Sequence, residues 1–139
     1  MLGDIFTPEK RSQIMGRIGS KNSKPEIAVR KLVHSLGYRF RLHDTKLPGK
    51  PDVVLPRHRK VIFINGCFWH GHKDCPRSKL PSTNVTFWAD KIAKNVIRDK
   101  RALKKLRLEG WRAMIVWQCE MKDPESLAQR LSRYLESRS

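Results

Sequence analysis

Two cysteines and two histidines lie within eleven consecutive residues near the middle of the chain, in the stretch N-G-C-F-W-H-G-H-K-D-C at positions 65–75. The third cysteine of the sequence, Cys119, lies far along the chain and directly follows an apolar run that reads as a strand. Cys67, His72, Cys75 and Cys119 together make a Cys3His set, which suits tetrahedral Zn²⁺. These residues would meet if the segments before Cys67 and Cys119 were neighbouring parallel strands, since Cys119 would then be carried back beside Cys67. This condition constrains the fold more than any other feature of the sequence.

Spacing alone leaves the ligand set open. His70 is a candidate fourth ligand as well as His72, and the alternative to a metal site is three buried thiols beside an incidental histidine. The cysteines lie in or beside loops rather than on an apolar stripe, which favours zinc. An odd number of cysteines, in a chain with no recognisable export signal at its start, argues against a disulfide framework. A zinc site that pins the loop to the sheet would stabilise the fold by on the order of several kcal/mol or more.

The length of 139 residues predicts a single domain over residues 1–139. Helical and strand-like patterns follow one another in the order helix, helix, strand, strand, strand, helix, strand, helix, without repeats. The second and third strands read as a hairpin, and the almost continuously apolar fourth strand reads as buried on both faces. The third strand, the long helix and the fourth strand form a right-handed crossover unit. We therefore expect an α/β sandwich around a mixed four-stranded sheet, with helices within 7–18, from Ser23 to Gly37, at 87–109 and from Asp123, and strands at 38–42, 51–55, 61–64 and 112–117.

The chain carries 30 Lys and Arg residues against 13 Asp and Glu residues, a formal charge of +17. This excess attracts polyanions, so nucleic acid is the expected partner. A basic amphipathic membrane binder is the alternative, but it would concentrate the charge on one face of an isolated helix, whereas here the basic residues are spread along the chain. No apolar run reaches the roughly eighteen residues that span a bilayer, and we expect a cytoplasmic, nucleoid-associated protein. The basic residues within 91–107 are interpreted as a solvated helix face.

Glu26, Asp52 and His70 form a candidate active site. Asp52 lies at the start of a predicted strand, between Pro51 and an apolar run, which is an unusual place for a charge. A carboxylate there would hold Mg²⁺ with water completing the octahedron, and a neighbouring imidazole would remove a proton from a metal-bound water. The alternatives are a turn carboxylate that caps its own backbone, a first-turn helix charge at Glu26 and an ordinary loop histidine.

Phe68 and Trp69 lie among the cysteines and histidines of the loop, and Trp88 follows at the start of the long helix. These aromatic residues either form a small core around the metal site or act as apolar wedges that enter a base stack and kink the duplex. Composition does not separate the two interpretations.

Several stretches resemble the very short patch repair (Vsr) endonucleases, a family that nicks DNA at T:G mismatches. The similarity runs in order along nearly the whole chain, and G-C-F-W-H combined with the later W-x-x-K-I-x-x-N and V-W-x-C is highly specific. The matching stretches are R-S-Q-I-M-G-R-I (11–18), K-P-E (24–26), L-P-G-K-P-D (47–52), V-I-F-I-N-G-C-F-W-H-G-H (61–72), F-W-A-D-K-I-A-K-N-V-I-R-D (87–99) and G-W-R-A-M-I-V-W-Q-C (110–119).

The resemblance implies a restriction-endonuclease-like fold with a structural zinc site. It implies that Asp52 and the main-chain carbonyl of Ile64 bind a catalytic Mg²⁺, that His70 is the catalytic histidine and that Glu26 supports the site. The implied zinc ligands are Cys67, His72, Cys75 and Cys119. Implied DNA-intercalating residues are Phe68, Trp69 and Trp88 from the major-groove side, and Met15 and Ile18 of a DNA-contacting segment, residues 1–22, from the minor-groove side.

By the same resemblance the protein is a Mg²⁺-dependent endonuclease that cuts one strand of duplex DNA 5′ of the thymine in a T:G mismatch. It would act as a monomer, with other mismatch-repair proteins as candidate partners. The chain departs from the nuclease pattern P-D…(D/E)-x-K, because Ile64-Asn65-Gly66 stands in place of its second half, and the best-studied members carry Thr-His where this chain has Ile64-Asn65. An auxiliary histidine is therefore missing, which places more of the proton transfer on His70. A restriction-type or junction nuclease on the same scaffold, and a zinc-stabilised DNA-binding module without catalysis, are the alternatives.

Overall fold

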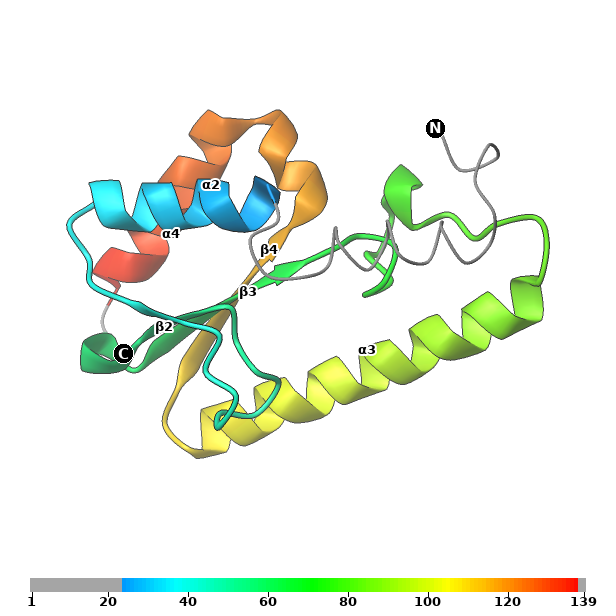
Figure 1. The fold of residues 1–139 in the computed structure, drawn as a ribbon, viewed down its shortest axis with the longest axis horizontal. Helices are drawn as coiled ribbons and strands as arrows, with labels where there is room; N and C mark the ends of the chain where they lie inside the picture. Colours follow the sequence, from blue (N-terminus) through cyan, green and yellow to red (C-terminus); the bar gives the residue numbers. More distant parts are fainter. Residues whose placement is uncertain (1–23, 138–139) are drawn as a thin grey trace.

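A mixed sheet with the strand order β1-β2-β3-β4 forms the centre of the computed structural model, which describes residues 24–137 (Figure 1). β1 pairs antiparallel with β2, β2 pairs antiparallel with β3, and β3 pairs parallel with β4. The predicted α/β class, the mixed four-stranded sheet and the hairpin of the second and third strands are thus confirmed. The strands are β1 (Arg41–Leu42), β2 (Val53–Leu55), β3 (Lys60–Asn65) and β4 (Arg112–Trp117).

Helices cover both faces of the sheet. α2 and α4 lie on one face, and the long helix α3 crosses the other (Figure 1). No helix within residues 24–137 has an apolar stretch long enough to span a bilayer. The α-helices are α2 (Lys24–Ser35), α3 (Val85–Leu108) and α4 (Pro124–Glu136), and the short 3-10 helices are η2 (Pro56–His58), η3 (Pro76–Ser78) and η4 (Gln118–Lys122).

Local signals that the sequence predicts set three of the helix ends. Gly37 and Gly110 adopt φ angles of 88° and 86° just after α2 and α3, a left-handed conformation that glycine takes without a steric penalty. Asp123 caps α4, because its carboxylate accepts a hydrogen bond of 3.2 Å from the backbone N–H of Ser126. The predicted helix within 7–18 and the predicted cap at Ser23 lie outside the described residues.

Side chains that alternate along the strands pack into two hydrophobic cores, one on each face of the sheet. The larger core lies between the sheet and the helices α2 and α4, and the smaller core lies between the sheet and α3. Within β2, for example, Val53 and Leu55 enter the larger core and Val54 enters the smaller one. The main members of the larger core are Val29, Val33, Val53, Leu55, Ile62, Met114, Val116, Leu127, Leu131 and Leu135.

A buried lysine ties α4 to the sheet. Lys60 is 1% exposed, and its ammonium donates hydrogen bonds to the carbonyls of Tyr134 (2.8 Å), Leu135 (3.0 Å) and Ser137. These carbonyls belong to the last turn of α4 and to the residue that follows it, where backbone acceptors lack helical partners and the helix dipole favours a cation. Lys60 therefore acts as a C-terminal cap supplied by β3.

Three sequence-based expectations need correction. The strand expected at 38–42 is reduced to Arg41–Leu42, the two residues that pair with β2, while Tyr38 and Phe40 pack against the core without pairing. The fourth strand is buried on one face only, since Ile115 is half-buried and lines a cavity on the other. The long helix begins at Val85 rather than at residue 87, and only its C-terminal half is deeply buried, at Ala102 and Leu106. Its N-terminal half extends beyond the sheet, toward the loop that follows β3 (Figure 1).

The parallel pairing of β3 and β4 positions the functional loops. The register runs from Lys60 opposite Arg112 to Asn65 opposite Trp117, so both strands end together. Cys67 and Cys119 each lie two residues beyond this shared end. Neighbouring parallel strands thus bring these distant cysteines to one edge of the sheet, as the sequence predicts.

Candidate active site and metal centre

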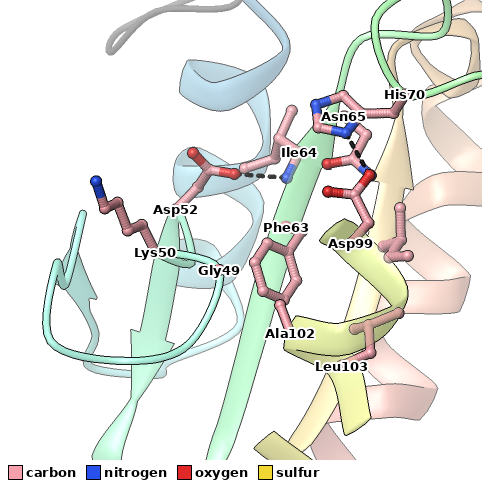
Figure 2. A pocket seen from close by; sticks show the side chains of 11 residues that line it. Gly49, Lys50, Asp52, Phe63, Ile64, Asn65, His70, Asp99, Ala102 and Leu103 are labelled. Atoms are coloured by element: carbon pink, nitrogen blue, oxygen red, sulfur yellow. Dashed lines mark hydrogen bonds and ion pairs between the residues drawn. The ribbon is translucent and has the colours of Figure 1, made fainter. Parts of the chain in front are cut away.

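Asp52 and His70 line one cavity of about 190 Å³ at the end of the sheet where β3 stops (Figure 2). Asp52 directly precedes β2, and His70 belongs to the loop after β3. Asp99 of α3 lines the same cavity and was not predicted as a site residue. The wall also includes Lys50, Phe63, Ile64, Asn65, Ala102, Leu103 and Ile115.

The Asp52 carboxylate is fixed by the backbone of the neighbouring strand. The N–H of Ile64 donates a hydrogen bond of 2.7 Å to its Oδ2 (Figure 2). The N–H of Asp52 itself donates a hydrogen bond of 3.1 Å to the carbonyl of Ile62. Burial raises the pKa of the Asp52 carboxyl above its ordinary value of 3.8, and the negative charge of Glu26 acts in the same direction. The N–H of Ile64 and the imidazoles of His43 and His70 oppose this rise. A positive ion bound beside Asp52 would stabilise its charged form.

His70 is held by a carboxylate from α3. Its Nδ1 lies 2.6 Å from Oδ2 of Asp99, and each side chain is 31% exposed (Figure 2). A carboxylate beside Nδ1 selects the tautomer that carries its proton there, which leaves the lone pair on Nε2. The His70–Asp99 pair therefore has the arrangement of a general base and its orienting acid. The sequence signal for Asp99 is the end of the stretch 87–99, where an acid stands among basic residues.

Glu26 lies close to Asp52 but is paired with two other residues. It is 2% exposed on α2, and its Oε1 lies 2.8 Å from Nε2 of His43 and 3.2 Å from Nη2 of Arg30. Ligand atoms of Glu26, His43 and Asp52 all lie within 4.8 Å of one another. The structure thus brings Glu26 to the site, and it adds His43, a residue that sequence reasoning missed because it stands in a loop without a motif.

The structure also brings Cys67, His72, Cys75 and Cys119 together. One ligand atom from each lies within 4.8 Å of the other three, and Sγ of Cys119 lies 3.5 Å from Nδ1 of His72. His72 stacks on Trp117, with ring centroids 4.0 Å apart and an interplanar angle of 8°. Since His70 is engaged with Asp99, it is His72 that joins the cysteines.

These four residues fit a tetrahedral zinc ion. Thiolates bound to zinc at about 2.3 Å lie about 3.8 Å from one another, a spacing that the cluster reaches with small side-chain rotations. Burial raises the pKa of the Cys67 thiol to about 12, so its thiolate needs a nearby positive charge. Donor type, number and proximity therefore all suit a closed structural site.

The loop between the two sites is anchored to α3. The side-chain amide of Asn95 donates a hydrogen bond of 2.9 Å to the carbonyl of Trp69. Gly71, with a φ of 59°, passes so close to α3 that an added Cβ would lie 2.8 Å from Cγ2 of Ile92. The backbone N–H of His72 also bonds to the carbonyl of Cys67 at 2.9 Å. One short, well-anchored loop thus carries His70 together with Cys67, His72 and Cys75, and Cys119 joins the cluster from η4.

Phe68, Trp69 and Trp88 form a half-buried aromatic cluster with edge-to-face contacts. Ring centroids lie 5.4 Å apart for Phe68 and Trp69, 5.5 Å for Phe68 and Trp88, and 5.7 Å for Trp69 and Trp88. Phe87, which was not predicted, packs on Trp88 at 5.1 Å and is 59% exposed. Met15 and Ile18, predicted to reach the minor groove, lie outside the described residues.

Basic side chains surround the outer surface of α3. All eight Lys and Arg residues of the helix that were interpreted as a solvated face are exposed, namely Lys91, Lys94, Arg98, Lys100, Arg101, Lys104, Lys105 and Arg107. Lys91 also places its ammonium 5.6 Å from the ring centroid of Trp69. Positive charge therefore extends up to the aromatic cluster.

Comparison with known proteins identifies the family. The family model described as DNA mismatch endonuclease Vsr matches residues 3–77. The chain is 49% identical over 133 residues to the type II nicking enzyme V.XorIIP of Xanthomonas oryzae pv. oryzae, covering 96% of this chain and 97% of that protein. It is 40% identical over 126 residues to the DNA mismatch endonuclease Vsr of Escherichia coli, covering 91% of this chain and 80% of that protein. The chain belongs to the Vsr family of DNA endonucleases.

Proposed function

We propose that this endonuclease nicks one strand of duplex DNA 5′ of the thymine in a T:G mismatch and that it depends on Mg²⁺. Related proteins named as nicking enzymes and as a mismatch endonuclease support single-strand cleavage and mismatch recognition. The observation that carries the proposal is the cavity shared by Asp52 and the His70–Asp99 pair.

Asp52 and the main-chain carbonyl of Ile64 would hold the Mg²⁺ ion. Bound there, the ion would polarise the phosphate and stabilise the leaving oxygen. The Nε2 atom of His70 would accept the proton of the attacking water, and Asp99 would keep the imidazole in that tautomer and stabilise its charged form. Glu26 would support the site from α2, as the resemblance implies.

Cys67, His72, Cys75 and Cys119 would hold Zn²⁺ as a structural ion. Phe68 and Trp69 lie between two of these residues in sequence, so a metal bound there would stiffen the loop that carries them. We infer that Phe68, Trp69 and Trp88 act as a wedge in the base stack beside the mismatch, because a wedge on a flexible loop would fold away instead of unstacking bases. The predicted DNA contacts of residues 1–22, including Met15 and Ile18, belong to the same proposal.

The surroundings of the site suit a DNA substrate. The chain has a formal charge of +17, and exposed basic residues run along α3 as far as Lys91, which contacts the ring of Trp69. Neutralisation of phosphates by such residues supplies affinity that does not depend on sequence. We further propose that the protein acts as a monomer in the cytoplasm, close to the nucleoid, where other mismatch-repair proteins are candidate partners.

Nicking assays test the proposal. Duplexes that differ only in one T:G or T:A pair are incubated with the zinc-loaded protein, with Mg²⁺ or with EDTA, and the cut strand is mapped. We expect a single Mg²⁺-dependent nick 5′ of the mismatched thymine, which Asp52→Ala abolishes and the exposed control Asp90→Asn retains. Equal cutting of both duplexes would favour a restriction-type or junction nuclease. Binding without any metal-dependent nick would favour a DNA-binding module.

A further inference from the structure

We propose that His43 is a nitrogen ligand of the catalytic cation, so that Glu26, His43 and Asp52 form a mixed site that prefers a first-row transition ion such as Mn²⁺ to Mg²⁺. The inference rests on the proposed function for the role of Asp52 at the reacting phosphate. It deepens that function by adding a ligand that is absent from the sequence motifs.

The three side chains already lie at coordination spacing. Nε2 of His43 is 2.8 Å from Oε1 of Glu26, and the ligand atoms of Glu26, His43 and Asp52 all fall within 4.8 Å of one another. Adjacent ligands of an ion bound at about 2.1 Å lie about 3 Å apart. Small side-chain rotations would therefore bring all three into one coordination sphere.

The backbone at His43 is held in an unusual conformation. His43 has a φ of 51°, in the left-handed region that residues with a Cβ seldom adopt, and its N–H donates a hydrogen bond of 3.1 Å to the carbonyl of Asp52. This bond extends the pairing of β1 with β2 by one position, so His43 lies directly opposite Asp52. Such strain persists where the surrounding structure enforces it and is concentrated at functional sites.

Asp52 has no second acidic ligand on β3. The nuclease pattern would place an acid and a lysine where this chain has Ile64-Asn65-Gly66, and Ile64 offers only its main-chain carbonyl. The structure supplies donors from the opposite side of Asp52, with Glu26 from α2 and His43 from the loop after β1. Glu26 is 2% exposed, so little water is available to stabilise its charge.

Arg30 competes with an ion for this position. Its Nη2 lies 3.2 Å from Oε1 of Glu26 and 3.2 Å from Nε2 of His43, so the guanidinium places a positive charge beside the Glu26 carboxylate. A guanidinium does not lose its proton in proteins, and it must therefore move aside when a cation binds. Removal of the Arg30 charge should strengthen cation binding.

The donor set determines the ion. Mg²⁺ prefers oxygen ligands and retains its waters, whereas an imidazole nitrogen favours first-row transition ions. Mn²⁺ also binds carboxylates well and has little preference for thiolates, so it distinguishes this site from the cysteine cluster. A Glu26–His43–Asp52 site therefore raises affinity for Mn²⁺ more than for Mg²⁺.

Mn²⁺ binding to the zinc-loaded full chain, followed by the electron paramagnetic resonance signal of unbound Mn²⁺ and without DNA, tests the inference. We expect His43→Asn, which tolerates the left-handed backbone, to weaken Mn²⁺ binding at least tenfold, while Mg²⁺ affinity measured by competition changes less than about twofold. His43→Gly, free of strain at this φ, should give the same loss. His34→Asn, at an exposed histidine of α2, should bind as the wild type does. Arg30→Gln should bind Mn²⁺ more tightly.

Two results would overturn the inference: equal Mn²⁺ affinity of the wild type and both His43 variants, or no Mn²⁺ binding by the wild type at millimolar concentrations. Its failure is distinguishable from failure of the proposed function because binding is measured without cleavage. A chain that binds Mn²⁺ through His43 and does not nick T:G duplexes would refute the proposed function alone. A chain that nicks T:G duplexes with unchanged Mn²⁺ binding in His43→Asn and His43→Gly would refute this inference alone.

Discussion

The Nδ1 atom of His70 lies 2.6 Å from Oδ2 of Asp99, across the gap between the loop after β3 and helix α3. This contact joins residues that are far apart in the chain and orients the imidazole toward the cavity that Asp52 also lines. In the proposed mechanism, α3 therefore supplies a residue of the active site and also covers one face of the sheet.

Asp99→Asn is therefore expected to slow nicking of a T:G duplex by about 10²–10⁴-fold, the usual contribution of a well-positioned general base. An amide at position 99 no longer selects the tautomer with its lone pair on Nε2. Binding of the uncut duplex should stay within a few-fold of the wild type. Single-turnover nicking and DNA binding measure the two effects, with exposed Asp90→Asn on the same helix as the control. A wild-type nicking rate in Asp99→Asn would contradict the role assigned to this pair.

The two neighbouring histidines of the loop should separate zinc binding from catalysis. His72→Gln should lose zinc and reduce the free energy of unfolding by on the order of several kcal/mol, because His72 joins the cysteine cluster. His70→Gln should retain zinc and stability while losing nicking. Metal content by mass spectrometry, urea unfolding and nicking rates give the three readouts. Full zinc content in His72→Gln together with loss of zinc in His70→Gln would reverse the assignment.

Asp52 should reduce stability at neutral pH while it supports catalysis. Burial raises the pKa of its carboxyl, so the folded state binds a proton more tightly than the unfolded state does. The contribution of Asp52 to the free energy of unfolding is therefore favourable at low pH, and it is lost as the pH rises above 3.8, the ordinary pKa of an Asp carboxyl, and through the raised pKa of the folded state. Without divalent catalytic ions, Asp52→Asn should be more stable than the wild type at pH 7, and this difference should shrink toward pH 4. Urea unfolding across this range measures it, and a variant that is less stable at pH 7 would contradict the raised pKa.

The aromatic cluster should control recognition rather than chemistry. Trp69→Ala is expected to reduce the preference for T:G over T:A duplexes by about tenfold, since stacking of one aromatic ring on a base contributes about 1–3 kcal/mol. Leu108→Ala provides a matched control, because Leu108 is 76% exposed at the far end of α3. Competition nicking with both duplexes in one reaction measures the preference. Retention of full discrimination by Trp69→Ala would favour a purely structural cluster around the metal site.

Much of this arrangement can be read from the sequence because local rules determine it. Short apolar runs mark β2, β3 and β4, Gly37 and Gly110 follow two of the helices, and Asp123 caps the last one. The cysteines and histidines carry their chemistry in their side chains, so a metal cluster can be predicted without knowledge of the fold. Asp52 is conspicuous because a charge begins an otherwise apolar strand.

Tertiary structure alone decides which of these groups meet. The spacing of His70 and His72 in the sequence does not tell which of them binds a metal. The structure distinguishes them, because His70 contacts Asp99 of α3, whereas His72 contacts Cys119 and Trp117 at the end of β4. In the sequence, nothing distinguishes His43 and Lys60 from ordinary polar residues. In the structure, the left-handed backbone after β1 brings His43 to Glu26, and Lys60 donates hydrogen bonds to the end of α4. The apolar periodicity of a segment indicates which face of a helix or strand a residue occupies. Contacts between side chains of different elements depend on how the helices pack against the sheet, and no local stretch of the sequence encodes that packing.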